Sequence, residues 1–352
     1  MNIGLALSGG GTRAGAFHIG VLKYLAEQKM LEDVKYISTV SGGSLLIVLI
    51  FKLNNYIWPS SDCFLNIILP KLEEIYTSVD YHHEMIVQFL KNPFFLLNRQ
   101  VAIKKVLNEK FNLYENLQDL PDSPLWAISA NTLETGKSWR FSKKHMGDYK
   151  IGYVDTPDFS LADAVTTSMS FPFIINSYEL DTRNFSWKKY KNFDSDEQIS
   201  ATISIKKLHL QDGGMYENLG TEALFKNDKI RPEINKIIVS DASAPLRMWT
   251  GAYSLFGVLK RQVDILSDQV RSLRTRNLVK FLIDNPGSGG YIKLGTACKA
   301  VNPLLPTELA AYPTDLKKFD KNKLCAFELY SYLLAKQTFL QYPLSLKEAN
   351  LL

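Results

Sequence analysis

Apolar segments near the N-terminus alternate regularly with glycine-rich turns. Ile3–Leu7 is a short apolar run that predicts a buried strand, and the spacing of apolar residues predicts a helix from about Ala14 to Gln28. Val34–Val40 predicts a second buried strand, and an apolar helix follows it from Ser44. Two consecutive units of strand, turn and helix predict a parallel sheet of the α/β class.

The middle of the chain departs from this pattern. Residues 54–118 show helical periodicity without strong strand signals, which predicts a helical insertion that could form a cap. Leu125–Ala130 and Trp139–Phe141 then predict a β-hairpin with its turn at residues 134–137. Ile234–Ser240 predicts a further strand.

Two later segments complete the pattern. Residues 181–200 are polar and mixed in charge, which predicts an exposed loop. Leu259–Ile283 predicts a long amphipathic helix, with an apolar side formed by Val263, Leu266, Val270 and Leu273. We therefore expect one domain over residues 1–352, with an insertion at about 54–118 and a helical part at about 259–352 packed on it.

Composition limits the class of protein. With 46% hydrophobic residues in a chain of 352, a large core can be buried. The three cysteines are widely spaced and form no CxxC pair, so neither a disulfide framework nor a zinc site is indicated. The net charge of +5 favours an anionic surface but is too diffuse to indicate a nucleic-acid partner.

Targeting and membrane-spanning signals are weak. The first residues carry no positive charges before the apolar run and lead directly into glycines, so they predict a strand and not a signal peptide. The longest apolar stretch, Leu45–Phe51, is far shorter than the roughly 20 residues that span a bilayer. We expect a soluble, cytoplasmic protein that could associate with membranes, and no oligomeric state is predicted.

Ser41 has the sequence context of an activated nucleophile. It lies between a predicted strand and a predicted helix, where a sharp turn would expose its hydroxyl. Gly43 stands two positions after it, as in a G-x-S-x-G elbow, whereas Thr39 replaces the first glycine. A serine that simply caps a helix is the alternative interpretation.

A glycine run also ends the first strand and opens the first helix. Backbone N–H groups of Gly9-Gly10-Gly11-Thr12-Arg13 could converge there on an anion, which predicts an oxyanion hole. Arg13 would contact a phosphate or clamp the turn. The run also fits the loose G-x-G-x-x-G/A fingerprint of nucleotide binding, but the second strand does not end in the acidic residue that this fingerprint needs.

A third element is Asp212-Gly213-Gly214, which places a carboxylate at the end of an alternating segment, although Asp-Gly turns are often structural. All five histidines precede Asp212, so an α/β-hydrolase triad in the order Ser, Asp, His cannot use it as the acid. The order Ser41, Asp163, His209 stays open, although we expect His209 to be a packed or edge residue of a strand.

Together, these three elements resemble the marks of the patatin-like phospholipase family, in the same order. A segment of small residues ending in proline, 164–172, is also similar. The resemblance implies a three-layer α/β/α fold with a mainly parallel sheet, and a catalytic dyad of Ser41 and Asp212. It also implies Gly9, Gly10 and Gly11 as the oxyanion loop, supported by Thr12 and Arg13, while Gly43, Gly213 and Gly214 support the elbow and the base.

The implied activity is hydrolysis of a carboxylic ester in a phospholipid or another acyl lipid through an acyl-enzyme, without a metal or other cofactor. Asp194-Ser195-Asp196 lacks the glycine and the glutamate of a calcium loop. A lipid groove could use Phe171, Phe173, Ile174 and Ile175. The second hypothesis is a non-catalytic lipid-binding protein that retains the fold.

Overall fold

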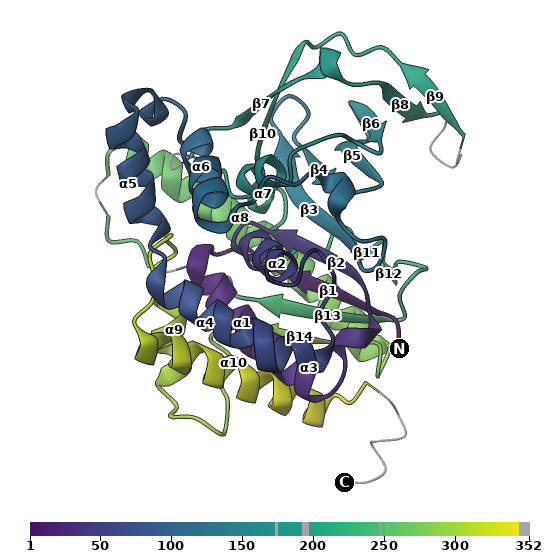
Figure 1. Ribbon diagram of the computed structural model, residues 1–352. Coiled ribbons are helices and arrows are strands. Elements are labelled where there is room, and N and C mark those ends of the chain that lie inside the picture. Colours follow the sequence, from purple (N-terminus) through teal and green to yellow (C-terminus); the bar gives the residue numbers. More distant parts are fainter. Residues whose placement is uncertain (173–174, 192–196, 247, 252, 345–352) are drawn as a thin grey trace.

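The computed structural model describes residues 1–352 except 173–174, 192–196, 247, 252 and 345–352 (Figure 1). Its strands are β1 (Ile3–Leu7), β2 (Val34–Val40), β3 (Leu125–Thr132), β4 (Lys137–Phe141), β5 (His145–Asp148), β6 (Gly152–Asp155), β7 (Tyr178–Asp181), β8 (Trp187–Tyr190), β9 (Gln198–Ala201), β10 (Lys207–Asp212), β11 (Phe225–Lys226), β12 (Lys229–Ile230), β13 (Lys236–Asp241) and β14 (Gly289–Lys293). Its helices are α1 (Gly11–Glu27), α2 (Gly42–Leu53), α3 (Ser61–Cys63), α4 (Leu69–Ser78), α5 (Tyr81–Lys91), α6 (Arg99–Phe111), α7 (Leu161–Ser168), α8 (Leu255–Asp284), α9 (Leu305–Ala310) and α10 (Lys321–Gln341).

The main sheet has a parallel part and an antiparallel part. The strands β14, β13, β1, β2 and β3 lie side by side in that order and are parallel. From β3 the sheet continues through antiparallel partners to β9, and the predicted hairpin is the pair β3 and β4. The parallel α/β prediction is therefore confirmed, with an antiparallel extension beyond β3.

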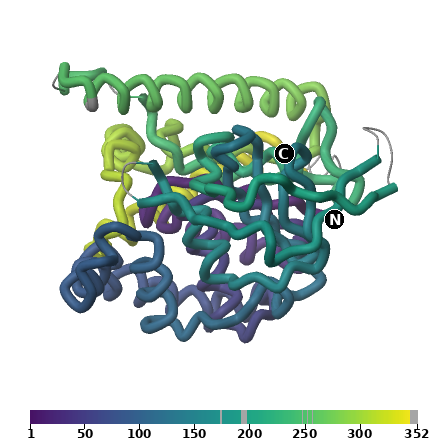
Figure 2. The backbone as a smooth tube through the Cα atoms, turned by 90° about the horizontal axis from the view of Figure 1, so that it is seen from above, coloured from purple at the N-terminus to yellow at the C-terminus, as the bar shows by residue number. Residues whose placement is uncertain are grey.

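Alternation along the buried strands separates the two faces of the sheet. Leu5 and Leu7 of β1 point into the large core beneath α1, α2 and α10, whereas Ala6 joins a smaller core on the opposite face. That second core includes Val239 of β13 and Leu278 of α8. Figure 2 shows α8 running along this side of the molecule, so the layers are helix, sheet and helix.

Two expectations about local structure are wrong. The polar residues 181–200 contain β8 and most of β9, which pair with each other so that Trp187 lies opposite Ala201. The ribbon forms because the large apolar ring of Trp187 is buried and anchors it to the body. Helix α8 is present, but Leu266 and Leu273 of its expected apolar side are exposed while Arg271 and Leu278 are buried. Its inner face meets polar groups of the body, among them Glu222 and Tyr291.

Smaller differences concern boundaries. Helix α1 begins at Gly11, three residues before the predicted start, because the glycine loop itself forms its first turn. Residues 54–118 contain α3, α4, α5 and α6, in agreement with their helical periodicity. Among the residues described, no helix is both long and apolar enough to cross a membrane.

Candidate active site

The pairing of β3 explains how Ser41 and Asp212 come together. Strand β2 runs parallel to β3 as far as Val40, which lies opposite Ser129. Strand β10 approaches along the same edge of β3 from the other direction and ends with Asp212 opposite Ala130. The two strands therefore meet end to end, and the residue that follows β2 lies beside the last residue of β10.

The backbone at Ser41 has the conformation of a strained elbow. Its φ of 51° and ψ of −117° are unusual for a residue with a side chain, and they turn the chain sharply from β2 into α2. The Ser41 N–H donates to Ser168 Oγ at 3.0 Å, and the Ser168 hydroxyl donates to the Ser129 carbonyl at 2.7 Å. These bonds tie the elbow to α7 and β3.

Thr39, which departs from the usual elbow glycine, is part of the same support. Its hydroxyl accepts a hydrogen bond from Trp126 Nε1 at 2.9 Å and lies 2.8 Å from Ser44 Oγ. Ser44 Oγ in turn lies 3.0 Å from Ser168 Oγ. The threonine is fully buried, and its side chain forms hydrogen bonds that a glycine at this position could not form.

Asp212 is almost completely buried. Its carboxylate accepts a hydrogen bond from the Gly214 N–H at 2.7 Å. Burial raises the pKa of Asp212 to about 7, although this N–H and the nearby Ser41 hydroxyl favour the charged form. Gly213 allows the close approach, since a Cβ there would lie 2.6 Å from the Ser129 carbonyl oxygen.

The glycine loop supplies amides beside Ser41. Gly10 and Gly11 have φ values of 143° and 62°, which other residues adopt only with strain. The N–H groups of Gly9 and Thr12 donate to the carbonyls of Asn218 and Asp315. Within the described part of the chain, no hydrogen bond engages the N–H groups of Gly10 and Gly11.

Arg13 acts as a clamp in this structure. Its Nη1 donates to the Tyr312 carbonyl at 2.8 Å, and its Nη2 donates to the Ala242 carbonyl at 3.1 Å. The Thr12 hydroxyl adds a hydrogen bond to the Lys317 carbonyl at 3.0 Å. Residues 312–317 therefore fasten the glycine loop from a distant part of the sequence.

Asn218 is a site residue that the sequence reasoning missed. Its carbonyl accepts the Gly9 N–H, and its Nδ2 donates to Ser243 Oγ at 2.9 Å. Its Oδ1 lies where a Cβ on Gly9 or Gly214 would collide, at 2.4 and 2.7 Å. Asn218 thus joins the glycine loop to the base loop, which consists of Asp212, the candidate base, with Gly213 and Gly214. A polar residue four positions after a double glycine was the available signal.

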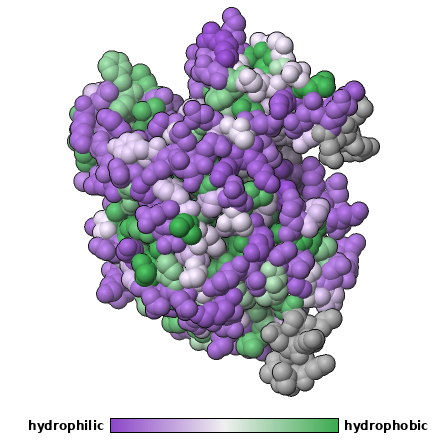
Figure 3. Space-filling model, turned by 45° about the vertical axis from the view of Figure 1, so that its right-hand side comes forward, coloured by the Kyte–Doolittle hydropathy of each residue, from purple (hydrophilic) through white to green (hydrophobic). Residues whose placement is uncertain are grey.

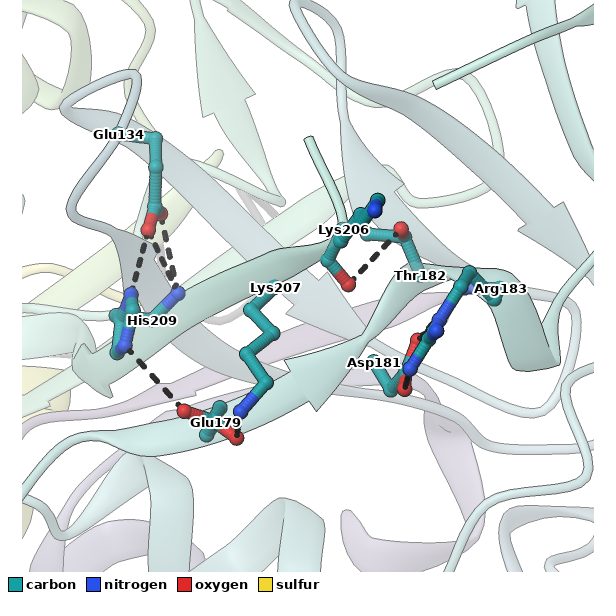
Figure 4. A network of polar contacts seen from close by, with 8 residues as sticks. All are labelled: Glu134, Glu179, Asp181, Thr182, Arg183, Lys206, Lys207 and His209. Atoms are coloured by element: carbon teal, nitrogen blue, oxygen red, sulfur yellow. Dashed lines mark hydrogen bonds and ion pairs between the residues drawn. The ribbon is translucent and has the colours of Figure 1, made fainter. Parts of the chain in front are cut away.

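The histidine-based triad is not assembled. Asp163 Oδ2 lies 2.6 Å from Lys104 Nζ, and His209 Nδ1 lies 2.7 Å from Glu134 Oε1. Figure 4 shows His209 among the charged side chains of β7 and β10, at a sheet surface. Asp163 and His209 thus contact other charged residues, and no contact among the described residues joins them to each other or to Ser41.

His18 is a buried histidine close to the site but with a structural environment. Its Nδ1 lies 2.7 Å from Ser240 Oγ and its Nε2 lies 2.9 Å from the Ser8 carbonyl oxygen. Burial lowers the pKa of His18 to about 4, so the ring is neutral and its Nε2 donates to the carbonyl. His18 therefore joins the ends of β1 and β13 beneath the glycine loop.

Of the expected lipid-groove residues, Phe171 is half-buried and Ile175 is buried, while Phe173 and Ile174 lie outside the described residues. Asp194, Ser195 and Asp196 also lie outside them. Among the residues that are described, no three His, Cys, Asp or Glu side chains form a group that could hold a metal ion.

Two exposed apolar tips lie on the same side of the molecule as the carboxyl ends of the parallel strands (Figures 1 and 2). The first tip is formed by Leu90, Phe94 and Leu97, and the second by Met248, Tyr253 and Leu255. These six side chains are between 76% and 89% exposed, more than any other large apolar side chain described. On the face seen in Figure 3, apolar side chains gather on the upper-left lobe, where α5 lies.

Comparisons with known proteins agree with the fold. The chain is similar to human GIVD cytosolic phospholipase A2, with 14% identity and a TM-score of 0.54 over 97% of this chain and 59% of that chain. The same human enzyme in complex with methyl gamma-linolenyl fluorophosphonate and terbium chloride gives 14% identity and a TM-score of 0.51, over 95% and 57% of the two chains. At this identity the likeness concerns the fold, and the chain spans less than two thirds of the enzyme's length. No match was found among curated protein sequences.

A family model for patatin-like phospholipases matches residues 5–225. The match covers more than half of the chain and includes the end of β1 with its glycine loop and the end of β10 with its double glycine. The predicted three-layer fold agrees with it. The chain belongs to the patatin-like phospholipase family.

Proposed function

We propose that this protein is a serine acyl hydrolase that cleaves carboxylic ester bonds of lipids with Ser41 as nucleophile and Asp212 as base. The observation that carries the proposal is the meeting of a serine on a strained elbow with a buried carboxyl whose pKa is raised to about 7. Family membership supports a lipid-hydrolysing enzyme. The dyad is supported by this geometry.

In the proposed reaction, Ser41 Oγ attacks the ester carbonyl carbon while Asp212 takes the hydroxyl proton. The developing oxyanion accepts hydrogen bonds from the N–H groups of Gly10 and Gly11. The N–H groups of the neighbouring Gly9 and Thr12 already donate to backbone carbonyls. Asp212 returns the proton to the departing alcohol or lysolipid, which leaves an acyl-enzyme. Asp212 then takes a proton from a water molecule that attacks the acyl carbon, and it returns this proton to Ser41 Oγ as the acyl–serine bond breaks and the fatty acid leaves.

The raised pKa gives Asp212 its strength as a base. An exposed aspartate has a pKa of about 3.9 and is a weak base towards a hydroxyl. At a pKa of about 7 the carboxylate is both well populated at neutral pH and a better proton acceptor. Gly213 and Gly214 support this environment because they let the backbone enclose the carboxylate.

A fluorophosphonate probe tests the nucleophile, since such a compound was captured with the human enzyme of similar fold. We expect labelling of the wild-type protein, no labelling of Ser41→Ala, and strongly reduced labelling of Asp212→Asn. His209→Ala is the matched control and should be labelled as the wild type is. Absence of labelling in the wild type would instead favour the non-catalytic lipid-binding protein.

The whole chain is proposed to act as one catalytic domain. The large core includes both Ile3 and Leu344, and residues 312–317 fasten the glycine loop. A protein shortened before residue 312 should therefore lose hydrolysis of a soluble ester, because Thr12 loses its acceptors Asp315 and Lys317 and Arg13 loses its acceptor Tyr312. Retained activity in that truncated protein would contradict the proposal.

The enzyme is further proposed to work in the cytoplasm at the surface of a phospholipid membrane. The two apolar tips flank the edge of the sheet where Ser41 lies, so a bilayer that receives both tips would face the nucleophile. The substrate itself is a lipid, which makes a bilayer the occupant that fits this surface. The net charge of +5 favours an anionic membrane.

Vesicle sedimentation tests the tips. Replacing Leu90, Phe94 and Leu97 by serine should reduce binding to phospholipid vesicles and hydrolysis of vesicle lipid, with hydrolysis of a soluble ester unchanged. The matched control replaces Ile57, Ile283 and Leu340, which are exposed elsewhere, by serine. Equal losses in both triple variants would show that general surface apolarity, and not the tips, governs binding.

A further inference from the structure

A basic groove lies between α8 and β14, apart from the proposed active site. Its volume is about 290 Å³, and it is lined by Arg271, Ser272, Thr275, Arg276 and Lys293. Three of these five side chains carry a positive charge, two carry a hydroxyl group, and none is acidic. Such a lining favours an anion with several oxygen atoms.

Arg271 is the unusual member of this lining. It is only 9% exposed, which is rare for an arginine. Its Nη2 donates to Asp268 one turn earlier in α8, but its Nη1 is buried and has no hydrogen-bond partner among the described residues. A buried donor that is left unsatisfied destabilises the fold. An anion held in the groove would stabilise the buried guanidinium group by balancing its charge.

The other two cations of the groove, Arg276 and Lys293, have no acidic partner among the described residues. Within the described residues, neither Arg276 nor Lys293 forms an ion pair, whereas Arg274 of the same helix is paired with Glu222 at 2.6 Å. Asp241, opposite Lys293 in the sheet, accepts a hydrogen bond from Tyr291 at 2.6 Å. Three positive charges at the groove are thus balanced by the single carboxylate of Asp268.

We propose that this groove binds a phosphate group. A phosphomonoester carries nearly two negative charges and three acceptor oxygens, which matches two guanidinium groups, an ammonium group and two hydroxyls better than a carboxylate does. The phosphate could be that of a soluble compound or that of a lipid headgroup such as a phosphorylated inositol. Both sources share the chemistry that the groove recognises.

The groove is connected to the base loop by a series of hydrogen bonds. Thr275 Oγ1 lies 3.3 Å from the Tyr291 hydroxyl, which donates to Asp241. The Asp241 carboxylate also accepts the Ser243 N–H at 2.8 Å, and Ser243 Oγ accepts from Asn218. A ligand that joins α8 to β14 therefore also steadies the residues that hold Asn218 beside the glycine loop.

The binding test uses the full chain and inorganic phosphate as the probe. We expect the thermal unfolding midpoint to rise saturably with phosphate, relative to chloride at equal ionic strength. The double variant Arg276→Gln/Lys293→Gln should weaken phosphate binding by at least about tenfold, since it removes two charge-assisted contacts. Ser272→Ala, which removes only one hydroxyl and leaves all charges, should weaken it less.

The matched control is Lys260→Gln/Lys336→Gln, which removes the same charge at exposed lysines outside the groove. It should bind phosphate as the wild type does. A wild-type protein without a saturable response, or a control that loses as much as the groove variant, would overturn the proposal. Because these readouts need no turnover, they stay distinct from the test of the dyad.

Vesicles distinguish the two sources of phosphate. If the source is a headgroup, vesicles of phosphatidylcholine with phosphatidylinositol 4-phosphate should sediment more wild-type protein than vesicles of phosphatidylcholine alone. The groove variant should lose this difference. Response to inorganic phosphate without such a difference supports a soluble phosphate compound as the ligand.

Discussion

Replacing Asp212 by asparagine keeps the shape of the side chain and removes its ability to ionise. In the folded protein burial raises the pKa of this carboxyl from 3.8 to about 7, so the neutral form suits the fold better than the charged form. The difference corresponds to about 4 kcal/mol at 1.36 kcal/mol per pKa unit. Asparagine avoids this cost, and its carbonyl can still accept the Gly214 N–H.

The sign depends on pH. Below pH 3.8 the carboxyl is neutral in both states, so the folded protein carries no penalty. Between 3.8 and about 7 the unfolded chain ionises first, and stability falls as pH rises; above about 7 the whole penalty is present. We therefore expect Asp212→Asn to be more stable than the wild type by up to about 4 kcal/mol near pH 8.5, and by less than half of that near pH 5.

Urea unfolding, followed by tryptophan fluorescence at several pH values, measures this difference. Asp163→Asn is the control, because it breaks the pair with Lys104 and should lower the free energy of unfolding. The reasoning is refuted if the amide at position 212 is less stable near pH 8.5, or if its advantage does not change with pH.

Three further predictions concern catalysis and its support. The kcat/KM for a soluble ester should fall about tenfold per pH unit below about 7, the pKa of Asp212, and a profile flat down to about pH 5 would exclude this carboxyl as the base. Gly11→Ala places a Cβ 2.3 Å from the Asp315 carbonyl oxygen at a φ of 62°, which should displace one proposed oxyanion donor and reduce kcat on the order of 100-fold. Gly136→Ala is the control, because Gly136 has the same φ of 62° but lies in open space. Thr39→Val keeps the side-chain shape but loses the hydrogen bonds with Trp126 and Ser44, so it should lower the free energy of unfolding by about 1–3 kcal/mol in urea titrations. Thr202→Val, at an exposed position, should change the free energy of unfolding little.

The parts of the fold that sequence could predict are those with strong local patterns. Strand β1 is an apolar run and β2 is rich in apolar and β-branched residues, and both end in glycine-rich turns, so both strands could be predicted from the sequence pattern. Strands β8 and β9 are short and largely exposed, and only the buried Trp187 distinguishes them from a loop. The inner face of α8 depends on the polar groups that it meets, which no pattern along the helix reveals.

A similar division applies to the candidate site. Ser41 and Asp212 could be proposed from residue types, glycine spacing and resemblance to a family. The supporting residues could not, because their roles depend on partners more than 80 residues away: Thr39 on Trp126, and Ser168 on the elbow itself. The sequence also could not show that the N–H groups of Gly9 and Thr12 find distant acceptors in Asn218 and Asp315, whereas those of Gly10 and Gly11 have none among the described residues.

The fastening of the glycine loop by residues 312–317 has a consequence for biosynthesis. A ribosome completes β1, β2 and β10 long before it reaches Tyr312 and Asp315, so the nascent chain holds Ser41 and Asp212 before the C-terminal anchors of Thr12 and Arg13 exist. If the proposed mechanism holds, a product that ends before Tyr312 would lack these contacts and should not yet hydrolyse the lipids of the cell that makes it.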